Sequence, residues 1–317
     1  MNNIGKLSLV YLAKPVYGGW ITYTAHMVLK YGCDLYKVTK RSEKNKRNFG
    51  YGVGYQNLCI DDLLQIPNLC IVALDKHYWD ILSKFPPSSY IVIHDPTELK
   101  PSKHMNPLIQ GDKLLHNFQV ITIRKRVQDY LKLKYNISSI FQKHPFYTYE
   151  TNLEPYTSRA LSISRIDFDK NTDIILKANK LIKNKENKIQ IFGAENRIYV
   201  HHKLADLDFY SYWKGKFEKS YPLSYQGKDI LKGATYVIDL STIKNDGGGT
   251  QYTFLEAIYQ DCVLILHREW IQQGSLFKEG VNCLCVDNEK ELSDILNNDI
   301  DISQILIESK KILNGHI

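Results

Sequence analysis

The sequence lacks any long apolar stretch. Its longest apolar runs, such as IVALD at 71–75 and VLIL at 263–266, are the size of strands, whereas a membrane-spanning helix needs about 20 apolar residues in succession. The first residues, MNNIGKLSLVYLA, run directly into a strand pattern without the basic, apolar and small-residue regions of a secretory signal. We therefore expect no membrane span and a cytoplasmic location, which would be the host cytoplasm for a viral protein.

The six cysteines do not include a CxxC pair of the kind that holds zinc. They stand mostly in apolar, strand-like contexts, so we expect buried, reduced thiols. Cys283 and Cys285 would point to the same face of a strand, which leaves a chelating pair as an alternative. Because no histidine or second cysteine pair stands nearby, we expect no metal. The cysteines are Cys33, Cys59, Cys70, Cys262, Cys283 and Cys285.

A GxGxxG fingerprint is also missing, together with the acidic residue that follows it by about 20 positions in dinucleotide-binding proteins. This absence disfavours a Rossmann dehydrogenase. The sequence shows no internal repeat, and its one low-complexity tract is the basic stretch KRSEKNKR at 40–47.

Positive charge is unevenly distributed along the 317 residues. Residues 1–150 contain 20 Lys and Arg against 11 Asp and Glu, a net charge of +9, whereas residues 151–317 contain 21 against 23, a net charge of −2, which together give the total of +7. An excess confined to one half indicates a polyanionic partner for that half, although lysine-rich surfaces also serve solubility alone.

Alternating strand-like and helical segments organise the chain into two series. The first includes KLSLVYLA, ITYTAHMVLKYG, CDLYKVTK, NLCIVALD, SYIVIHD and QVITIR; the second includes RALSISRI, NTDIILKANKLIKNK, KIQIFGA, YPLSYQGK, GATYVIDLS, CVLILH and CLCVD. Each series predicts an α/β domain with a parallel, doubly wound sheet. We expect two Rossmann-like domains, 1–150 and 151–302, joined near the linker 144–157, and a C-terminal helix, 303–317, that can pack back on the N-terminal domain.

Ligands of open α/β sheets gather at the carboxyl ends of the strands. Gly18 and Gly19 follow the first strand, where glycines let backbone amides approach a phosphate before a helix that we expect to begin near Ile21. A plain tight turn is the alternative. After a later strand, His94 can hydrogen-bond a sugar hydroxyl and Asp95 can deprotonate an acceptor hydroxyl, although a His-Asp pair is also ordinary turn chemistry.

The second series offers cations at the same kind of position. Arg165 follows the strand RALSISRI, and Lys170 comes five residues later, before a helix. An arginine fork and a lysine point charge suit a diphosphate. The alternative is that both cations simply pair with Asp167 and Asp169.

The stretch NDGGGTQYTFLEAIYQDCVLIL, 245–266, combines three glycines with a helix that we expect to begin near Thr250. Phe254, Leu255, Ile258 and Tyr259 would lie on or near one apolar face, which leaves Glu256 near the helix start. Glu256 either caps its own helix or accepts hydrogen bonds from a ligand hydroxyl there.

This ordered set of motifs resembles the retaining GT-B glycosyltransferases, family 4-like, over most of the chain. The likeness is strongest from SISRIDFDKN to EGVNCLCVDNEKEL, which ends in a loop similar to the EGxNG loop of that family. The resemblance implies two Rossmann-like domains facing across a cleft, with a UDP-sugar bound mainly by the C-terminal domain and an acceptor by the N-terminal domain. It implies Arg165 and Lys170 on the donor diphosphate, Glu256 on the ribose, and these donor-loop residues: Gly18, Gly19, Gly248, Gly249, Thr250 and Gln251.

One departure from the family concerns its motif of two glutamates, whose first member would fall in the triple glycine, at Gly249. That glutamate contacts the donor sugar in the family, so its absence puts the usual sugar-binding scheme in doubt. A subgroup, the phage DNA α-glucosyltransferases, has an ExTxLE-like helix start that QYTFLEA resembles, with Gln251 in place of the earlier glutamate. It also has a His-Asp pair after a strand, similar to His94 and Asp95.

The basic half suits a nucleic-acid acceptor. Cations at 40–47 precede aromatic residues and glycines, an order that places phosphates on the former and an unstacked base on the latter. A mobile, solvated loop is the alternative. Adding a sugar to a hydroxymethylated pyrimidine of phage DNA would require reaching the base in a groove or flipping it out. The expected acceptor contacts are Lys44, Lys46, Arg47, Tyr51 and Arg124.

The sequence therefore predicts a retaining, metal-independent glycosyltransferase without a resident cofactor, because no DxD-type carboxylate pair precedes an obvious metal loop. In this scheme Arg165 and Lys170 replace the metal's charge, Asp95 or the leaving phosphate takes the acceptor's proton, and His94 holds the donor sugar. Other possibilities are a glycan acceptor, a nucleotide-sugar epimerase, and a non-catalytic DNA-binding module on a decayed transferase fold. The sequence does not indicate an oligomeric state.

Overall fold

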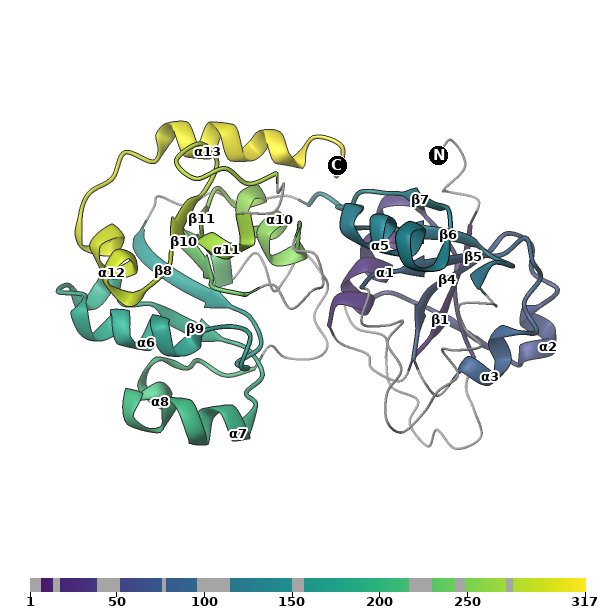
Figure 1. The fold of residues 1–317 in the computed structure, drawn as a ribbon, viewed down its shortest axis with the longest axis horizontal. Helices are drawn as coiled ribbons and strands as arrows, with labels where there is room; N and C mark the ends of the chain where they lie inside the picture. The colour runs from purple at the N-terminus through teal and green to yellow at the C-terminus, as the bar shows by residue number, and fades with distance from the viewer. Residues whose placement is uncertain are drawn as a thin grey trace.

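A computed structural model describes residues 7–13, 18–38, 52–75, 78–95, 115–149, 157–216, 230–242, 249–271 and 276–317. These residues form two α/β domains, drawn on the right and left of Figure 1. None of the described helices is long and apolar enough to cross a membrane.

The N-terminal domain contains a seven-stranded parallel sheet in the order β3-β2-β1-β4-β5-β6-β7. Its strands are β1 (Ser8–Leu12), β2 (Leu35–Val38), β3 (Gln56–Leu58), β4 (Leu69–Leu74), β5 (Tyr90–Ile93), β6 (Gln119–Thr122) and β7 (Ser139–Phe141). The helices are α1 (Gly19–Tyr31), α2 (Ile60–Leu63), α3 (Trp79–Leu82) and α5 (Lys125–Tyr135). The strand order reverses between β1 and β4, so the loop after β1 lies where such sheets bind ligands.

The C-terminal domain contains a five-stranded parallel sheet in the order β12-β11-β10-β8-β9. Its strands are β8 (Thr157–Ile163), β9 (Gln190–Phe192), β10 (Ala234–Asp239), β11 (Val263–His267) and β12 (Leu284–Val286). Every residue of β10 is buried, as expected for a central strand covered on both faces.

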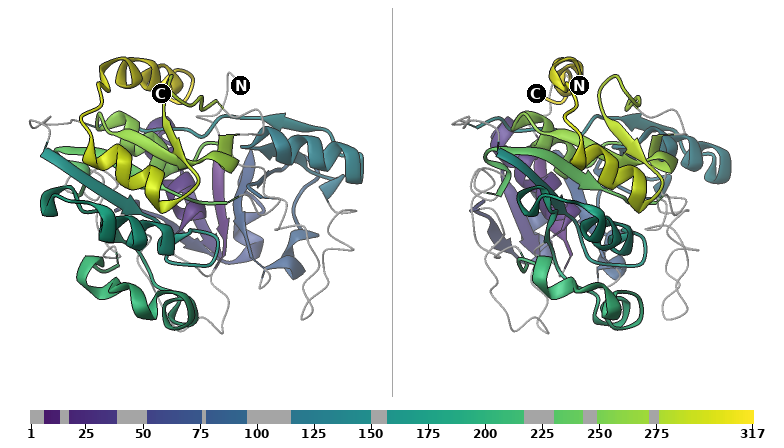
Figure 2. Two further views of the ribbon diagram at one scale, coloured as in Figure 1. Left: turned by 60° about the vertical axis from the view of Figure 1, so that its left-hand side comes forward. Right: turned by 90° about the vertical axis from the view of Figure 1, so that its left-hand side faces the viewer.

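The helices of this domain cover both faces of its sheet and supply two apolar clusters. They are α6 (Thr172–Leu181), α7 (Arg197–Tyr199), α8 (Phe209–Tyr212), α10 (Tyr252–Tyr259), α11 (Arg268–Ile271), α12 (Glu289–Asn297) and α13 (Ser303–Lys310). Four short helical segments complete them: η3 (Lys185–Asn187), η4 (Val200–Leu204), η5 (Ala205–Leu207) and η6 (Lys311–Leu313). Figure 2 shows α13 at the opposite end of this domain from the α7 and α8 region.

The expected helix at 303–317 is shorter than predicted, because α13 ends at Lys310 and is followed by η6. The helix itself packs on α10 and β11 of the C-terminal domain. The residues after it reach the other domain: Lys30 of α1 donates a hydrogen bond to the carbonyl oxygen of His316 at 2.6 Å. The chain end therefore lies between the two domains (Figure 1).

Two boundaries differ from the sequence predictions. α1 begins at Gly19, two residues before Ile21, because Gly18 takes the N-cap with a φ of 97°. α10 begins at Tyr252 instead of near Thr250. The strand-like stretch YPLSYQGK at 221–228 lies outside the described residues.

Candidate functional site

Gly18 and Gly19 lie at the carboxyl end of β1, at the point where the strand order reverses. A Cβ atom added to either glycine would meet no heavy atom of the described residues within 4 Å. The described part of the chain therefore leaves the space beside the backbone open at both positions. The positive φ of Gly18 favours glycine there, because other residues adopt that conformation only with strain.

His94 and Asp95 follow β5 in the same domain, but their surroundings differ from a solvent-exposed turn. His94 is buried and donates a hydrogen bond from Nε2 to the carbonyl oxygen of Val72 on β4 at 2.8 Å. Burial lowers the pKa of His94 to about 4, so the imidazole is neutral at pH 7.

Arg124 lies beside this pair and not on an open face of the domain. It follows β6 at the N-cap of α5, and its guanidinium lies 3.7 Å from the Asp95 carboxylate, with only 17% of the Arg124 side chain exposed. The residue expected to contact an acceptor phosphate thus forms an ion pair with the residue expected to receive the acceptor's proton. The sequence did not predict this pairing.

Arg165 lies in the loop after β8 and remains 65% exposed. Its guanidinium contacts Asp167 at 3.1 Å and Asp169 at 3.6 Å. The alternative that both cations pair with these aspartates therefore holds for Arg165, whereas Lys170 bonds Ser241. Asp167 and Asp169 have the spacing of a DxD pair, but both are ion-paired with Arg165. Exposed pairs of this kind contribute about 0–1 kcal/mol, so an incoming anion can displace the carboxylates at small cost.

Lys170 turns inward, toward the end of the central strand. Its ammonium donates to Ser241 Oγ at 2.6 Å, and the Ser241 hydroxyl and amide both donate to Oδ1 of Asp239, the amide at 2.9 Å. Asp239 is buried, and its Oδ2 has no hydrogen-bond partner in the part of the chain that the structure describes. A hydrogen-bonded chain from Asp239 through Ser241 thus holds Lys170 at the carboxyl edge of the sheet.

The triple-glycine loop leads into α10 on the same edge. Gly249 has a φ of 97°, and its carbonyl oxygen accepts a hydrogen bond from Trp270 Nε1 at 3.0 Å. Thr250 is buried and Gln251 takes the N-cap of α10 without a side-chain capping bond. The family motif has seven residues between its two glutamates. With Glu256 as the second glutamate, the first therefore falls on Gly248, and its assignment to Gly249 from the sequence was wrong by one position. Both positions are glycine.

Glu256 lies in α10, with its side chain 15% exposed, and does not cap its own helix. Its Oε2 accepts a hydrogen bond from the phenol of Tyr149, which belongs to the segment between the two domains. Burial raises the pKa of Glu256 to about 7, although the bond from Tyr149 acts in the opposite direction. The carboxylate is therefore a titratable group in the neutral range, at the place where both domains meet.

An aromatic cluster surrounds this carboxylate. His26 of α1 stacks on Tyr252 of α10, with ring centroids 4.4 Å apart, and on Phe146 of the crossing segment at 4.9 Å. Neither His26 nor Tyr149 carries a motif, so sequence reasoning missed both. For Tyr149 the one sequence signal was the density of aromatic and histidine residues in 144–149, and His26 had none.

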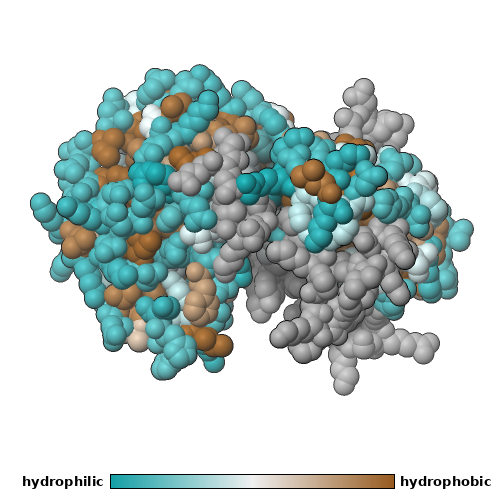
Figure 3. Space-filling view, in the orientation of Figure 1, coloured by the Kyte–Doolittle hydropathy of each residue, from teal (hydrophilic) through white to brown (hydrophobic). Residues whose placement is uncertain are grey.

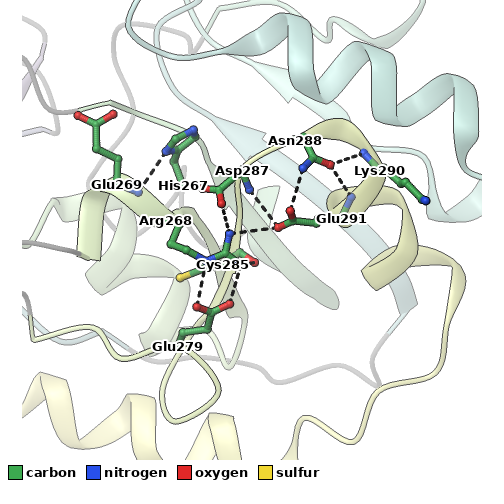
Figure 4. Close-up of polar contacts among 9 residues, drawn as sticks. All are labelled: His267, Arg268, Glu269, Glu279, Cys285, Asp287, Asn288, Lys290 and Glu291. Atoms are coloured by element: carbon green, nitrogen blue, oxygen red, sulfur yellow. Dashed lines mark hydrogen bonds and ion pairs between the residues drawn. The ribbon is translucent and has the colours of Figure 1, made fainter.

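The EGxNG-like loop has a structural role. Arg268 of α11 binds Glu279 through two hydrogen bonds of 2.9 and 3.2 Å, and also contacts Asp287 and Glu291 (Figure 4). These bonds, the ones to Glu279 foremost, raise the pKa of the Arg268 guanidinium further. Asn282 closes the loop by accepting from the Lys278 amide at 2.7 Å and donating to the Leu276 carbonyl at 3.0 Å.

Five of the six cysteines are buried thiols, but Cys59 is exposed and accepts a hydrogen bond from the Asp62 amide at the start of α2. The sulfur atoms of Cys283 and Cys285 lie 3.9 Å apart. Within the described ranges no group of three or more metal-binding side chains comes together. Four expected acceptor residues, Lys44, Lys46, Arg47 and Tyr51, and the donor-loop residue Gly248 lie outside those ranges.

Comparison with known proteins identified structural relatives only. No family model and no curated protein matches the sequence. The Anabaena protein HepE, solved with UDP and glucose, has a TM-score of 0.65 at 13% identity, over 98% of this chain and 95% of its own. An α-glucosyltransferase solved with UDP and a 13-mer DNA containing an HMU base has a TM-score of 0.65 at 11% identity, over 97% and 94%.

A third structure, TarM of S. aureus, was solved as a mutant with fondaparinux, α-GlcNAc-glycerol and UDP. It has a TM-score of 0.58 at 12% identity, over 79% of this chain and 53% of its own. Likeness at such identities shows the fold. Together with the two parallel sheets, it confirms the predicted architecture: the chain has the α/β fold of the GT-B glycosyltransferases.

Proposed function

We propose that this protein is a glycosyltransferase that takes its sugar from a nucleotide-sugar donor, with UDP as the nucleotide. The observation that carries the proposal is the set of polar groups at the carboxyl edge of the C-terminal sheet. Arg165 and Lys170 lie near the ends of β8 and β10, and α10, the helix that carries Glu256, follows β10. UDP-bound structures with this fold along nearly their whole length support it.

In the proposed donor complex, Arg165 leaves its aspartates for the diphosphate, and Lys170 faces the phosphates from its anchor on Ser241. These cations stabilise the charge that develops on the leaving UDP, which is electrostatic catalysis. Glu256 accepts hydrogen bonds from the ribose. Gly248, Gly249, Thr250 and Gln251 close over the phosphates and the sugar.

The N-terminal domain takes the acceptor, and Gly18 and Gly19 bring backbone amides toward the donor phosphates. Attack on the same face as the departing diphosphate gives retention of configuration. Asp95 or the leaving phosphate receives the acceptor's proton. Neutral His94 holds the donor sugar. No metal is needed in this scheme, because the two cations supply the positive charge.

The acceptor that we propose is duplex DNA with hydroxymethylated pyrimidines. The net charge of +9 in residues 1–150 favours a polyanion. Part of that charge lies on α5, whose Lys125, Arg126, Lys132 and Lys134 are exposed. The likeness to an α-glucosyltransferase solved with DNA supports the same acceptor.

A glycan is the second candidate acceptor. It is favoured by the likeness to TarM, which was solved with fondaparinux and α-GlcNAc-glycerol. The position of Arg124 also favours it, because an ion pair with Asp95 engages this cation inside the domain.

The test is transfer of radiolabel from a panel of UDP- and GDP-sugars to duplex DNA with and without 5-hydroxymethyl pyrimidines, with nucleotide release measured in parallel. We expect label on the hydroxymethylated DNA alone. Release of UDP without labelled DNA would move the search to glycan acceptors, and epimerised or free sugar would indicate an epimerase. DNA binding without nucleotide release would contradict a transferase and support a decayed fold.

A further inference from the structure

His26 is held between the two domains. It lies in α1, and its side chain is completely buried. One face of the imidazole stacks on Tyr252 of α10, at an interplanar angle of 8°, and Phe146 of the crossing segment stacks on it at 27°. The orientation of this ring is therefore determined by parts of the chain on both sides of the domain boundary.

The hydrogen bonds of His26 determine which nitrogen carries its proton. The Tyr147 amide donates to Nδ1 at 2.8 Å, so Nδ1 carries no proton and its lone pair accepts this bond. Burial, assisted by Lys30, lowers the pKa of His26 to about 3, so the ring is neutral and its one N–H is on Nε2. Nε2 has no hydrogen-bond partner among the described residues.

This unpaired Nε2–H faces Glu256. Nε2 lies 3.9 Å from Oε1 of the carboxylate, which is about 1 Å longer than a hydrogen bond. The other oxygen, Oε2, already accepts from Tyr149. Tyr149 is itself anchored on α10, because Gln260 donates to its phenol oxygen at 3.0 Å and its amide donates to Tyr259 at 3.1 Å.

We propose that His26 is a positioning residue for Glu256: when the donor binds, α1 and α10 approach each other and Nε2–H of His26 donates to Oε1. This inference rests on the proposed function, which assigns the donor ribose to Glu256. The bond would satisfy a buried N–H that is otherwise unpaired, which favours the closed arrangement. It would also link the N-terminal domain to nucleotide binding in the C-terminal domain.

The same hydrogen bond has a consequence for pH dependence, because an N–H donor favours the ionised form of a carboxylate. The groups that face Glu256 are His26 from α1, Tyr149 from the crossing segment, and Tyr252 of α10. Lys30 lies one turn after His26 on α1. Of the three groups that face Glu256, His26 is the one from the N-terminal domain, and its Nε2 lies 3.9 Å from Oε1.

The test is calorimetric titration with UDP between about pH 5.5 and 8.5 for the wild type, Glu256→Gln, His26→Phe and His26→Gln. In the wild type we expect affinity to rise with pH as Glu256 ionises, and in Glu256→Gln we expect only the smaller rise near about pH 6 that ionisation of the terminal phosphate of UDP produces. His26→Phe keeps an aromatic ring without the N–H. It should move the midpoint of the rise upward by about one pH unit and weaken binding at pH 7 by about 3- to 10-fold.

His26→Gln is the rescue variant, because its amide restores a donor of similar reach. It should bring the midpoint back toward the wild-type value although the ring stacking is lost. If His26→Phe does not fold by circular dichroism, His26→Asn replaces it, since its amide is too short to reach Glu256.

Three results would overturn the inference and leave the proposed function standing. An unchanged midpoint in the folded His26→Phe or His26→Asn protein would make His26 a packing residue only. A failure of His26→Gln to restore the midpoint would exclude the N–H as the cause. A rise of affinity with pH that is as large in Glu256→Gln as in the wild type would exclude Glu256 as the titrating group. Failure of the wild type itself to bind UDP at any pH would instead refute the proposed function, and the inference with it.

Discussion

At the scale of single residues, Glu256 makes the stability of the protein depend on pH. Because burial raises its pKa to about 7, the folded state favours the protonated carboxyl. The resulting stabilisation is complete below the ordinary pKa of about 4.5 and is lost as pH rises through 7. Two and a half pKa units correspond to about 3 kcal/mol.

Glu256→Gln should therefore be about as stable as the wild type at pH 5 and more stable by up to about 3 kcal/mol at pH 8. Chemical denaturation at both pH values measures this difference. Glu186→Gln, at an exposed position in η3, is the control and should show no such dependence. A constant difference between Glu256→Gln and the wild type across this range would contradict a buried, titrating Glu256.

Arg165 allows a second prediction at this scale. Since the Arg165 side chain is 65% exposed, Arg165→Ala should change stability little. If its guanidinium grips the diphosphate, the variant should lose UDP affinity and turnover on the order of 100-fold, because a charged partner would be left unpaired. Lys185→Ala is the control and should behave like the wild type. It removes an exposed cation from η3, which precedes β9 and so lies at the amino ends of the strands, away from the carboxyl ends where Arg165 lies. Normal turnover in Arg165→Ala would remove Arg165 from the site.

At the scale of elements, a close approach between β8 and β9 shapes the loop that carries Arg165. Gly193 follows β9 with a φ of 144°, and a Cβ atom there would lie 1.7 Å from the carbonyl oxygen of Ser164. Gly193→Ala should therefore destabilise the protein by about 3 kcal/mol or more, or prevent folding. Gly54→Ala, where a Cβ atom meets no atom of the described residues within 4 Å, is the matched control. Equal melting temperatures for the two variants would refute this close packing.

The contacts between α11, α12 and the edge of the sheet depend on Arg268. Its guanidinium links Glu279, in the loop before β12, with Asp287 and Glu291 after that strand (Figure 4). Arg268→Met should lower the free energy of unfolding by about 1–3 kcal/mol, because three neighbouring carboxylates lose their shared partner. Arg126→Met on the exposed face of α5 should cost less than about 0.5 kcal/mol. Equal effects in urea denaturation would show that the Arg268 network adds nothing.

At the scale of the whole molecule, the last residues join the two domains. The carbonyl oxygen of His316 accepts from Lys30 at 2.6 Å and from the Phe146 amide at 2.8 Å. His316 Nδ1 lies 2.8 Å from the His144 carbonyl oxygen, and Lys143 donates to the Asn314 carbonyl oxygen. These contacts tie the chain end to α1 and to the crossing segment at once.

Removal of residues 314–317 should therefore weaken the coupling between the domains more than the folding of either domain. We expect calorimetric unfolding to separate into two transitions in the truncated protein, since two-state behaviour requires domains that unfold together. Ile317 alone can be removed as a control, because its side chain is 55% exposed. An unchanged single transition after removal of 314–317 would contradict a joining role.

The surface is consistent with this division into two domains. On the face drawn in Figure 3, hydrophilic residues predominate over the described parts of both domains. The apolar side chains are concentrated in the clusters that line the two sheets, so each sheet has its own core. Among the described residues, the contacts between the domains include the aromatic and polar side chains around Glu256 and the hydrogen bond from Lys30 to the chain end.

The sequence by itself determined the class of fold, the two parallel sheets and the strand ends at which His94, Arg165 and Lys170 lie. Alternation of strands and helices and the glycines that punctuate them are local patterns, which neighbouring residues encode. Only the tertiary structure decided the partners: Asp95 with Arg124, Lys170 with Ser241 and Asp239, and Glu256 with Tyr149, which is 107 positions away. Such contacts depend on how distant segments and whole domains pack, which periodicity along the chain does not specify.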